Sequence, residues 1–199
     1  MTRRSGWTLP ALADAYLSGG ARFIQIRSKH APSGAFLETC EDVVARAHKA
    51  GATVIVNDRA DIARLSAADG VHVGQEDLDP AAVRRILGDS AIIGMSTHSP
   101  EQVLAALRMP VDYIAVGPIF GTSTKAIGYR DVGTALVSEA VAMVRAADTD
   151  TPIVAIGGIT LERAPGVIAA GASSVAVISD LLSTGNPEAR VKEYMRAIS

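Results

Sequence analysis

Short, continuously apolar and β-branched segments alternate along the chain with longer segments whose apolar residues recur every three or four positions. The first kind is typical of strands buried on both faces of a parallel sheet, and the second kind is typical of amphipathic helices. The pattern predicts seven strands, at 22–26, 53–56, 70–73, 91–95, 112–116, 152–156 and 173–178, and eight helices, at about 9–18, 33–49, 59–66, 80–87, 99–107, 133–147, 160–169 and 187–198.

Capping residues and glycines mark the ends of these helices. A capping side chain followed by proline favours a helix N-terminus, because the side chain accepts a hydrogen bond from a free backbone N–H group. Thr160 with Glu162 indicates another start. The capping pairs are Asp79-Pro80, Ser99-Pro100 and Asn186-Pro187, and the glycines that follow helices are Gly19, Gly51, Gly88 and Gly171.

The repetition of strand and helix predicts parallel βαβ units. No long polar linker interrupts it, so we expect one domain over residues 1–199. An open doubly wound sheet and a closed barrel both contain such units. Eight helices, seven strands and a helix as the first element favour an α/β fold of the (β/α)8 TIM-barrel type that lacks or replaces its first N-terminal strand. Residues 1–8 are too polar to supply that strand.

Composition narrows the class of protein. Hydrophobic residues make up 48% and charged residues 20% of the chain, which is typical of a globular domain and excludes a disordered one. The 19 basic and 21 acidic residues give a net charge of -2, so there is no basic excess to hold a nucleic acid. The single cysteine, Cys40, cannot form an internal disulfide, and no apolar run is long enough to span a membrane. We therefore expect a cytoplasmic protein with small-molecule ligands.

Polar residues gather directly after the apolar strands, where a barrel of this kind builds its active site. Gln25 and Arg27 share one face of the first strand by two-residue alternation, and Lys29 follows in the loop. An amide and two cations on one side suit a phosphate-rich anion. The alternative is a solvated strand end, where arginine and lysine are also common.

Two carboxylates follow neighbouring strands, Asp58 after the second and Asp77 after the third. Mg²⁺ is commonly held by one or two carboxylates together with water and substrate phosphate. Taken singly, Asp58 reads as a helix cap and Asp77 as a turn residue. Their position on neighbouring strands beside a cationic strand end favours a magnesium site.

Later strand ends add hydroxyls, glycines and another cation. Ser96 closes the fourth strand, and the loop 117–125 is rich in Gly, Ser and Thr and ends in Lys125, without the spacing of a Walker A loop. The alternative for this loop is simple flexibility. Gly157-Gly158 follows the sixth strand, where barrels commonly bind phosphate. His72 and His98 are expected to be structural.

These segments together resemble the thiamine phosphate synthase family, from about Leu9 to the C-terminus. Six motifs in the same order carry the resemblance, which makes it specific. They are Gln25–Lys29, Val56–Arg59, Ala68–Asp77, Gly94–His98, Asp112–Phe120 with Thr122–Lys125, and Ala155–Thr160.

The resemblance implies a magnesium-dependent transferase that joins a pyrimidinylmethyl diphosphate to a thiazole phosphate and releases diphosphate. It implies that Gln25, Ile26, Arg27, Ser28, Lys29 and Asn57 hold the pyrimidine diphosphate and that Ser96 and Lys125 contact its diphosphate. It implies that Asp58 and Asp77 bind Mg²⁺. It also implies that Thr122, Ser123, Thr124, Gly158, Ile178 and Ser179 bind the thiazole phosphate.

Arg27, Lys29, Lys125 and Ser96 are the expected catalytic residues, because the leaving diphosphate needs charge stabilisation and no protein nucleophile is required. Ser28 stands where the family usually has Glu, and the family's apolar first strand is not found in this sequence. A thiazole tautomerase-like relative, a phosphosugar isomerase barrel and a noncatalytic phosphate-binding barrel are the alternatives. The oligomeric state stays open, and a homodimer is among the states allowed.

Overall fold

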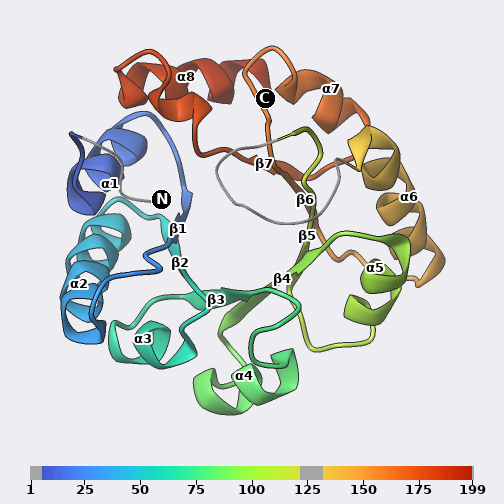
Figure 1. Ribbon diagram of the computed structural model, residues 1–199, viewed down its shortest axis with the longest axis horizontal. Coiled ribbons are helices and arrows are strands. Elements are labelled where there is room, and N and C mark those ends of the chain that lie inside the picture. Colours follow the sequence, from blue (N-terminus) through green and yellow to red (C-terminus); the bar gives the residue numbers. More distant parts are fainter. Residues whose placement is uncertain (1–5, 122–131, 199) are drawn as a thin grey trace.

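Seven parallel strands curl around a central axis, with the helices on their outer side (Figure 1). The computed structural model describes residues 6–121 and 132–198. The strands are β1 Phe23–Ile26, β2 Thr53–Asn57, β3 Gly70–Val73, β4 Ile92–Thr97, β5 Tyr113–Val116, β6 Ile153–Ile156 and β7 Ser174–Ala176. The helices are α1 Leu9–Ser18, α2 Ser33–Lys49, α3 Ala60–Leu65, α4 Pro80–Leu87, α5 Pro100–Ala106, α6 Gly133–Ala146, α7 Ala164–Ala169 and α8 Pro187–Ala197, with a 3-10 turn, η1, at Asp180–Leu182.

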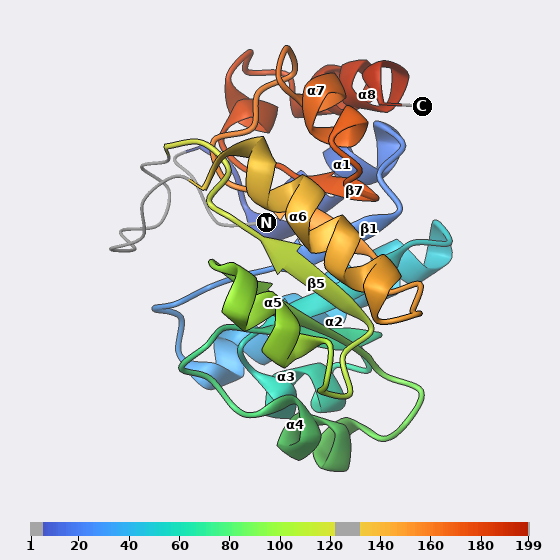
Figure 2. The ribbon, with the colours of Figure 1, turned by 90° about the vertical axis from the view of Figure 1, so that its right-hand side faces the viewer.

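Neighbouring strands pair in strict chain order from β1 to β7, and every pair is parallel. Each crossover is a helix on the outer face, and the side view shows α5 and α6 packed on the outer side of β5 (Figure 2). The expected barrel-type fold with seven strands is confirmed. All strand carboxyl ends consequently lie at one end of the barrel.

The expected capping residues start their helices. Asp79, Ser99 and Asn186 each accept a hydrogen bond from a backbone N–H in the first helical turn, and each is followed directly by proline. Thr8, which is not among the expected caps, caps α1 in the same way. Cys40 is fully buried in α2. The amphipathic pattern and the caps therefore agree on where these elements begin.

Most boundaries agree with the sequence-based expectation within one residue, and three differ by two or more. Strand β7, expected to reach residue 178, ends at Ala176. The helix expected from residue 160 begins at Ala164, because the Thr160 carbonyl accepts hydrogen bonds from the N–H groups of Arg163 and Ala164, both at 3.0 Å, and forms a separate turn. Strand β4 continues beyond residue 95 to Thr97, which pairs with Val116 of β5. Ser96 therefore lies within a strand and not in the loop after it.

The sheet is open between β7 and β1 over the described residues. Helices α1 and α8 pack together on the outside of this opening (Figure 1), so closely that a Cβ on Gly19 would lie 2.6 Å from Val191 Cβ. Leu12, Tyr16, Ile24 and Val191 form a second small apolar core between α1, α8 and β1. The ring of helices is thus continuous where the ring of strands is not. Among residues 6–8 only Trp7 forms an isolated β-bridge, which is too short to be a strand, and residues 1–5 lie outside the described part of the chain.

Gly94 makes room for the side chain of Tyr113 in the barrel interior. A Cβ on Gly94 of β4 would lie 1.9 Å from the ring of Tyr113 on the neighbouring strand β5. The Tyr113 ring meets Phe23 of β1 edge to face, with 5.7 Å between ring centroids. Gly94 therefore permits the contact that crosses the barrel from β5 to β1. None of the helices described is long and apolar enough to cross a membrane.

We expect Gly94→Ala to destabilise the protein by about 1–3 kcal/mol, the usual cost of overpacking a core. The melting temperature should fall by several degrees, measured by calorimetry. Gly166→Ala in α7 is the matched control, because a Cβ there meets no atom within 4 Å, and it should be neutral or stabilising. Equal melting temperatures for Gly94→Ala and the wild-type protein would contradict this account of the interior.

Candidate functional site

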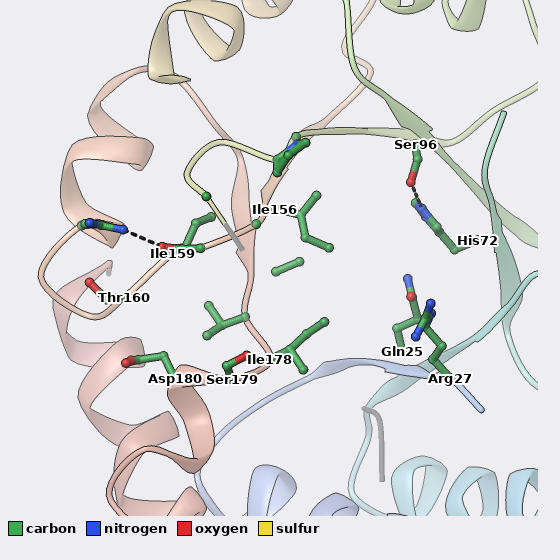
Figure 3. A pocket seen from close by; sticks show the side chains of 18 of the residues that line it. Gln25, Arg27, His72, Ser96, Ile156, Ile159, Thr160, Ile178, Ser179 and Asp180 are labelled. Carbon is green, nitrogen blue, oxygen red and sulfur yellow. Dashed lines mark hydrogen bonds between the residues drawn. The ribbon is translucent and has the colours of Figure 1, made fainter. Parts of the chain in front are cut away.

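A cavity of about 420 Å³ opens at the carboxyl ends of the strands (Figure 3). Every strand contributes a residue at or near its carboxyl end, including Ala176 of β7, and the segment after β7 adds more. Among the residues that the sequence predicts for the site, seven line this cavity. They are Gln25, Arg27, Asn57, Ser96, Gly158, Ile178 and Ser179.

Ser96 is held by a chain of hydrogen bonds across the barrel. Its hydroxyl lies 2.7 Å from Nε2 of His72, and Nδ1 of His72 lies 2.9 Å from the Tyr113 hydroxyl (Figure 3). Burial raises the pKa of Tyr113, which keeps its hydroxyl protonated, and the Gln25 side chain hydrogen-bonds to it. The Ser96 carbonyl accepts a bond of 2.6 Å from Gln75 Nε2. The chain fixes the position of Ser96 and links the β1 and β4 sides of the cavity.

A carboxylate pair stands beside this wall. Asp58 and Asp77 hydrogen-bond to each other, and the charges of Lys29 and Arg27 act on Asp58. Burial, followed by the charge of Asp77, raises the pKa of Asp58, and the two cations offset only part of this effect. Asp58 has a φ of 63°, and its N–H donates to the His72 carbonyl at 2.8 Å. The two carboxylates therefore lie side by side, next to the two cations.

This pair fits the ligand set of Mg²⁺. The part of the chain that the structure describes has no group of three or more His, Cys, Asp or Glu side chains suited to a metal. A pair of carboxylates is sufficient for Mg²⁺, which takes its other oxygen ligands from water and phosphate. A divalent cation would also relieve the repulsion that raises the pKa of Asp58.

Glycines shape the opposite wall. Gly157 and Gly158 have φ values of 101° and 62°, a region that favours glycine. A Cβ on Gly157 would lie 2.7 Å from Pro118, and one on Gly158 would lie 2.6 Å from the Gly121 carbonyl oxygen. The segments after β5 and β6 are therefore in direct contact. Their backbones line the cavity where the sequence predicts phosphate binding.

The structure adds residues that sequence reasoning did not assign to the site. His72 is buried, as expected, but it also lines the cavity, and so does His98, which hydrogen-bonds the Gly117 carbonyl. Arg163 donates to the Gly158 carbonyl at 3.0 Å, with its guanidinium 4.5 Å from the centroid of the Phe120 ring. Asp180 follows Ser179 on the same wall. His72 and His98 lie within the motifs, Arg163 lies three residues after one, and Asp180 directly follows the predicted residues Ile178 and Ser179.

Other predicted site residues lie elsewhere. Ile26 is completely buried in the main core and does not line the cavity, so its contact with the pyrimidine diphosphate stays a prediction. Ser28 is half-buried and does not line the cavity, and Lys29 is exposed beside Asp58. The predictions for Thr122, Ser123, Thr124 and Lys125 fall on residues outside the described part of the chain.

Comparisons with known proteins point to one activity. The family model described as thiamine monophosphate synthase matches residues 2–181. The chain is 43% identical over 179 residues to the thiamine-phosphate synthase of Chlorobium luteolum, covering 90% of this chain and 82% of that protein. It is 39% identical over 206 residues to the thiamine-phosphate synthase of Mycobacterium tuberculosis, covering 99% and 91%. The solved structure of thiamine phosphate pyrophosphorylase from Pyrococcus furiosus matches with a TM-score of 0.89 at 29% identity, covering 99% and 92%.

We expect Asp58→Asn to stabilise the protein in chelator-treated buffer near neutral pH. The raised pKa of Asp58 means that the folded state loses stability as pH rises above the ordinary carboxyl pKa, and asparagine removes this loss. A rise of about 1–2 °C in melting temperature is the expected size for a half-exposed group. Added Mg²⁺ should raise the melting temperature of the wild-type protein but not that of the variant.

Asp42→Asn is the matched control, because Asp42 lies exposed on α2 in an ion pair with Arg46. It should not raise the melting temperature and should keep the response to Mg²⁺. A response to Mg²⁺ of equal size in Asp58→Asn would contradict the assignment of this pair as metal ligands.

Proposed function

The chain belongs to the thiamine monophosphate synthase family, and from this premise we propose how its cavity carries out the reaction. The protein is a thiamine-phosphate synthase, a transferase of thiamine biosynthesis. Its reaction joins 4-amino-2-methyl-5-pyrimidinylmethyl diphosphate to a thiazole phosphate, giving thiamine phosphate and diphosphate. A homodimer and a cytoplasmic location stay predictions.

The wall formed by β1 to β4 binds the pyrimidine diphosphate in this proposal. Gln25 and Asn57 line the cavity and orient the substrate by hydrogen bonds, and Ser96 donates its hydroxyl to the diphosphate. Arg27 and Lys29 lie near Asp58 and supply positive charge to the departing diphosphate. Lys125, which lies outside the described residues, would add a third cation.

The observation that carries the proposal is the position of Asp58 beside the cavity. Asp58 hydrogen-bonds to Asp77 and interacts electrostatically with Lys29 and Arg27. Two carboxylates and two cations suit a metal–diphosphate group, because they can bind the metal and the diphosphate. An uncharged ligand would use none of these charges. Magnesium held by Asp58 and Asp77 would supply Lewis-acid stabilisation of the diphosphate charge. The protein residues then have to bind, orient and exclude water while the benzylic-type C–O bond breaks and the thiazole nitrogen attacks the methylene carbon.

The wall formed by the segments after β6 and β7 binds the thiazole phosphate in this proposal. Gly158, Ile178 and Ser179 line this side of the cavity, and glycine lets a phosphate approach the backbone closely. The predicted contacts of Thr122, Ser123 and Thr124 would complete the subsite from the segment after β5. The two substrates thereby meet across the cavity with their charged groups on opposite walls.

The alternatives make different demands on the site. A thiazole tautomerase-like barrel handles one phosphate and needs no carboxylate pair, so the contact between Asp58 and Asp77 favours the synthase. A noncatalytic barrel would bind both phosphorylated compounds without joining them.

The direct experiment mixes the purified protein with both phosphorylated substrates and Mg²⁺ and follows thiamine phosphate by mass. We expect product that depends on both substrates and on Mg²⁺. Binding of both compounds without any product would contradict the synthase and favour the noncatalytic barrel.

Two substitutions test the diphosphate wall. Asp58→Ala and Arg27→Ala should each lower turnover by about 100-fold or more, because each removes charge stabilisation that grows in the transition state. Asp42→Ala, on the outer surface of α2, should leave turnover unchanged. Near-normal rates for Asp58→Ala at limiting Mg²⁺ would overturn the metal assignment.

A further inference from the structure

The carboxylate of Asp180 joins three segments of the chain at the thiazole side of the cavity. Its Oδ2 accepts hydrogen bonds from the Leu161 N–H at 3.3 Å, from Arg190 Nε at 3.0 Å and from the Tyr194 hydroxyl at 2.7 Å. Leu161 follows β6, Asp180 follows β7, and the other two residues lie on α8. One oxygen atom thus connects both phosphate-side segments to the C-terminal helix.

These bonds are largely shielded from water. The side chains of Asp180 and Arg190 are 14% and 12% exposed, and Tyr194 is buried. Hydrogen bonds between charged groups are stronger than neutral ones, and partial burial reduces their screening. Burial, together with the hydrogen bond and charge of Asp180, raises the pKa of Tyr194, so its hydroxyl remains a donor.

The connected segments carry the proposed thiazole phosphate contacts. Ile178 and Ser179 immediately precede Asp180, and Figure 3 shows these three residues together on one side of the cavity, with Thr160 beside them. Gly158 lies three residues before Leu161. A change in the bonds to Asp180 would therefore alter the separation of the two segments that must hold one phosphate between them.

Arg190 also reduces an electrostatic conflict. An unpaired carboxylate next to Ser179 would repel a phosphate dianion. Arg190 places two nitrogens on Asp180 Oδ2, Nε at 3.0 Å and Nη2 at 2.9 Å, and it is shared with Glu193 at 2.9 Å and Glu162 at 3.9 Å. The pairing therefore offsets part of the Asp180 charge and lowers its cost to anion binding.

We propose that Asp180, through Arg190 and Tyr194, is a positioning residue that sets the spacing of the thiazole phosphate subsite. The proposal rests on the proposed function, since that function places the thiazole phosphate on this wall. Asp180 touches neither reacting atom. We expect Asp180 to affect the affinity for the thiazole phosphate and not that for the pyrimidine diphosphate.

Steady-state kinetics with each substrate varied in turn tests the proposal. We expect Asp180→Asn to raise KM for the thiazole phosphate by about tenfold, which equals about 1.4 kcal/mol. The KM for the pyrimidine diphosphate and kcat at saturation should stay within about twofold, because the diphosphate wall is untouched. Tyr194→Phe removes the hydroxyl that bonds Asp180 and, at 3.4 Å, the Ile159 carbonyl, but keeps the ion pair, and it should raise the same KM by a smaller factor.

Lys192→Met is the matched control, because Lys192 pairs with Glu188 on the exposed side of the same helix, at 2.5 Å, and should change neither KM. A merely structural role would lower the active fraction and leave both KM values unchanged. Unchanged KM for the thiazole phosphate, or an equal rise for both substrates, would overturn the proposal. If Asp180→Asn does not fold, Tyr194→Phe decides by the same criteria.

Calorimetric titration with the thiazole phosphate alone separates this proposal from the proposed function. Weaker binding by Tyr194→Phe than by the wild-type protein supports the positioning role even if no thiamine phosphate is formed, a result that would contradict only the synthase. Equal binding by wild type and variant overturns the positioning role even if the wild-type protein is an active synthase. Absence of wild-type binding overturns it as well.

Discussion

Backbone hydrogen bonds between parallel strands, paired in chain order from β1 to β7, determine where the candidate site residues that the structure describes lie. Parallel pairing turns each carboxyl end toward the same end of the barrel, so residues more than a hundred positions apart meet around one cavity. Gln25 of β1 and Ser179 after β7 reach it in this way. The helices and the interior contacts, such as the Tyr113 ring over Gly94, serve to hold this pairing.

Electrostatics then divides the cavity into two walls. One wall has an acidic pair, Asp58 and Asp77, set against the charges of Arg27 and Lys29. This arrangement is unfavourable for the metal-free protein, as the raised pKa of Asp58 shows, and it becomes favourable with a divalent cation and a diphosphate. The other wall uses glycine backbone and the Asp180–Arg190 pair, in which the acidic charge is partly offset. The division corresponds to a substrate that brings a metal and a substrate that brings a single phosphate.

Much of this could be predicted from sequence, because buried parallel strands and capped helices have strong local patterns. The helices at 9–18, 33–49 and 80–87 have the expected bounds, and seven of the residues predicted at the strand ends line the cavity. The resemblance to a family supplied the roles. Local patterns do not show which side chains that are distant in the sequence meet in space. Two-residue alternation already places Ile26 on the face away from the cavity, whereas Asp180 depends on partners ten and fourteen positions away in α8.

The central claim is that diphosphate and thiazole phosphate bind at the same time on opposite walls, and only the diphosphate requires the metal. Calorimetric titration of the thiazole phosphate into protein saturated with Mg²⁺ and inorganic diphosphate tests this most directly. The account predicts that thiazole phosphate binds as tightly as it does without diphosphate, or more tightly, and that chelating Mg²⁺ releases only the diphosphate. Competition between the two ligands for one site would contradict it.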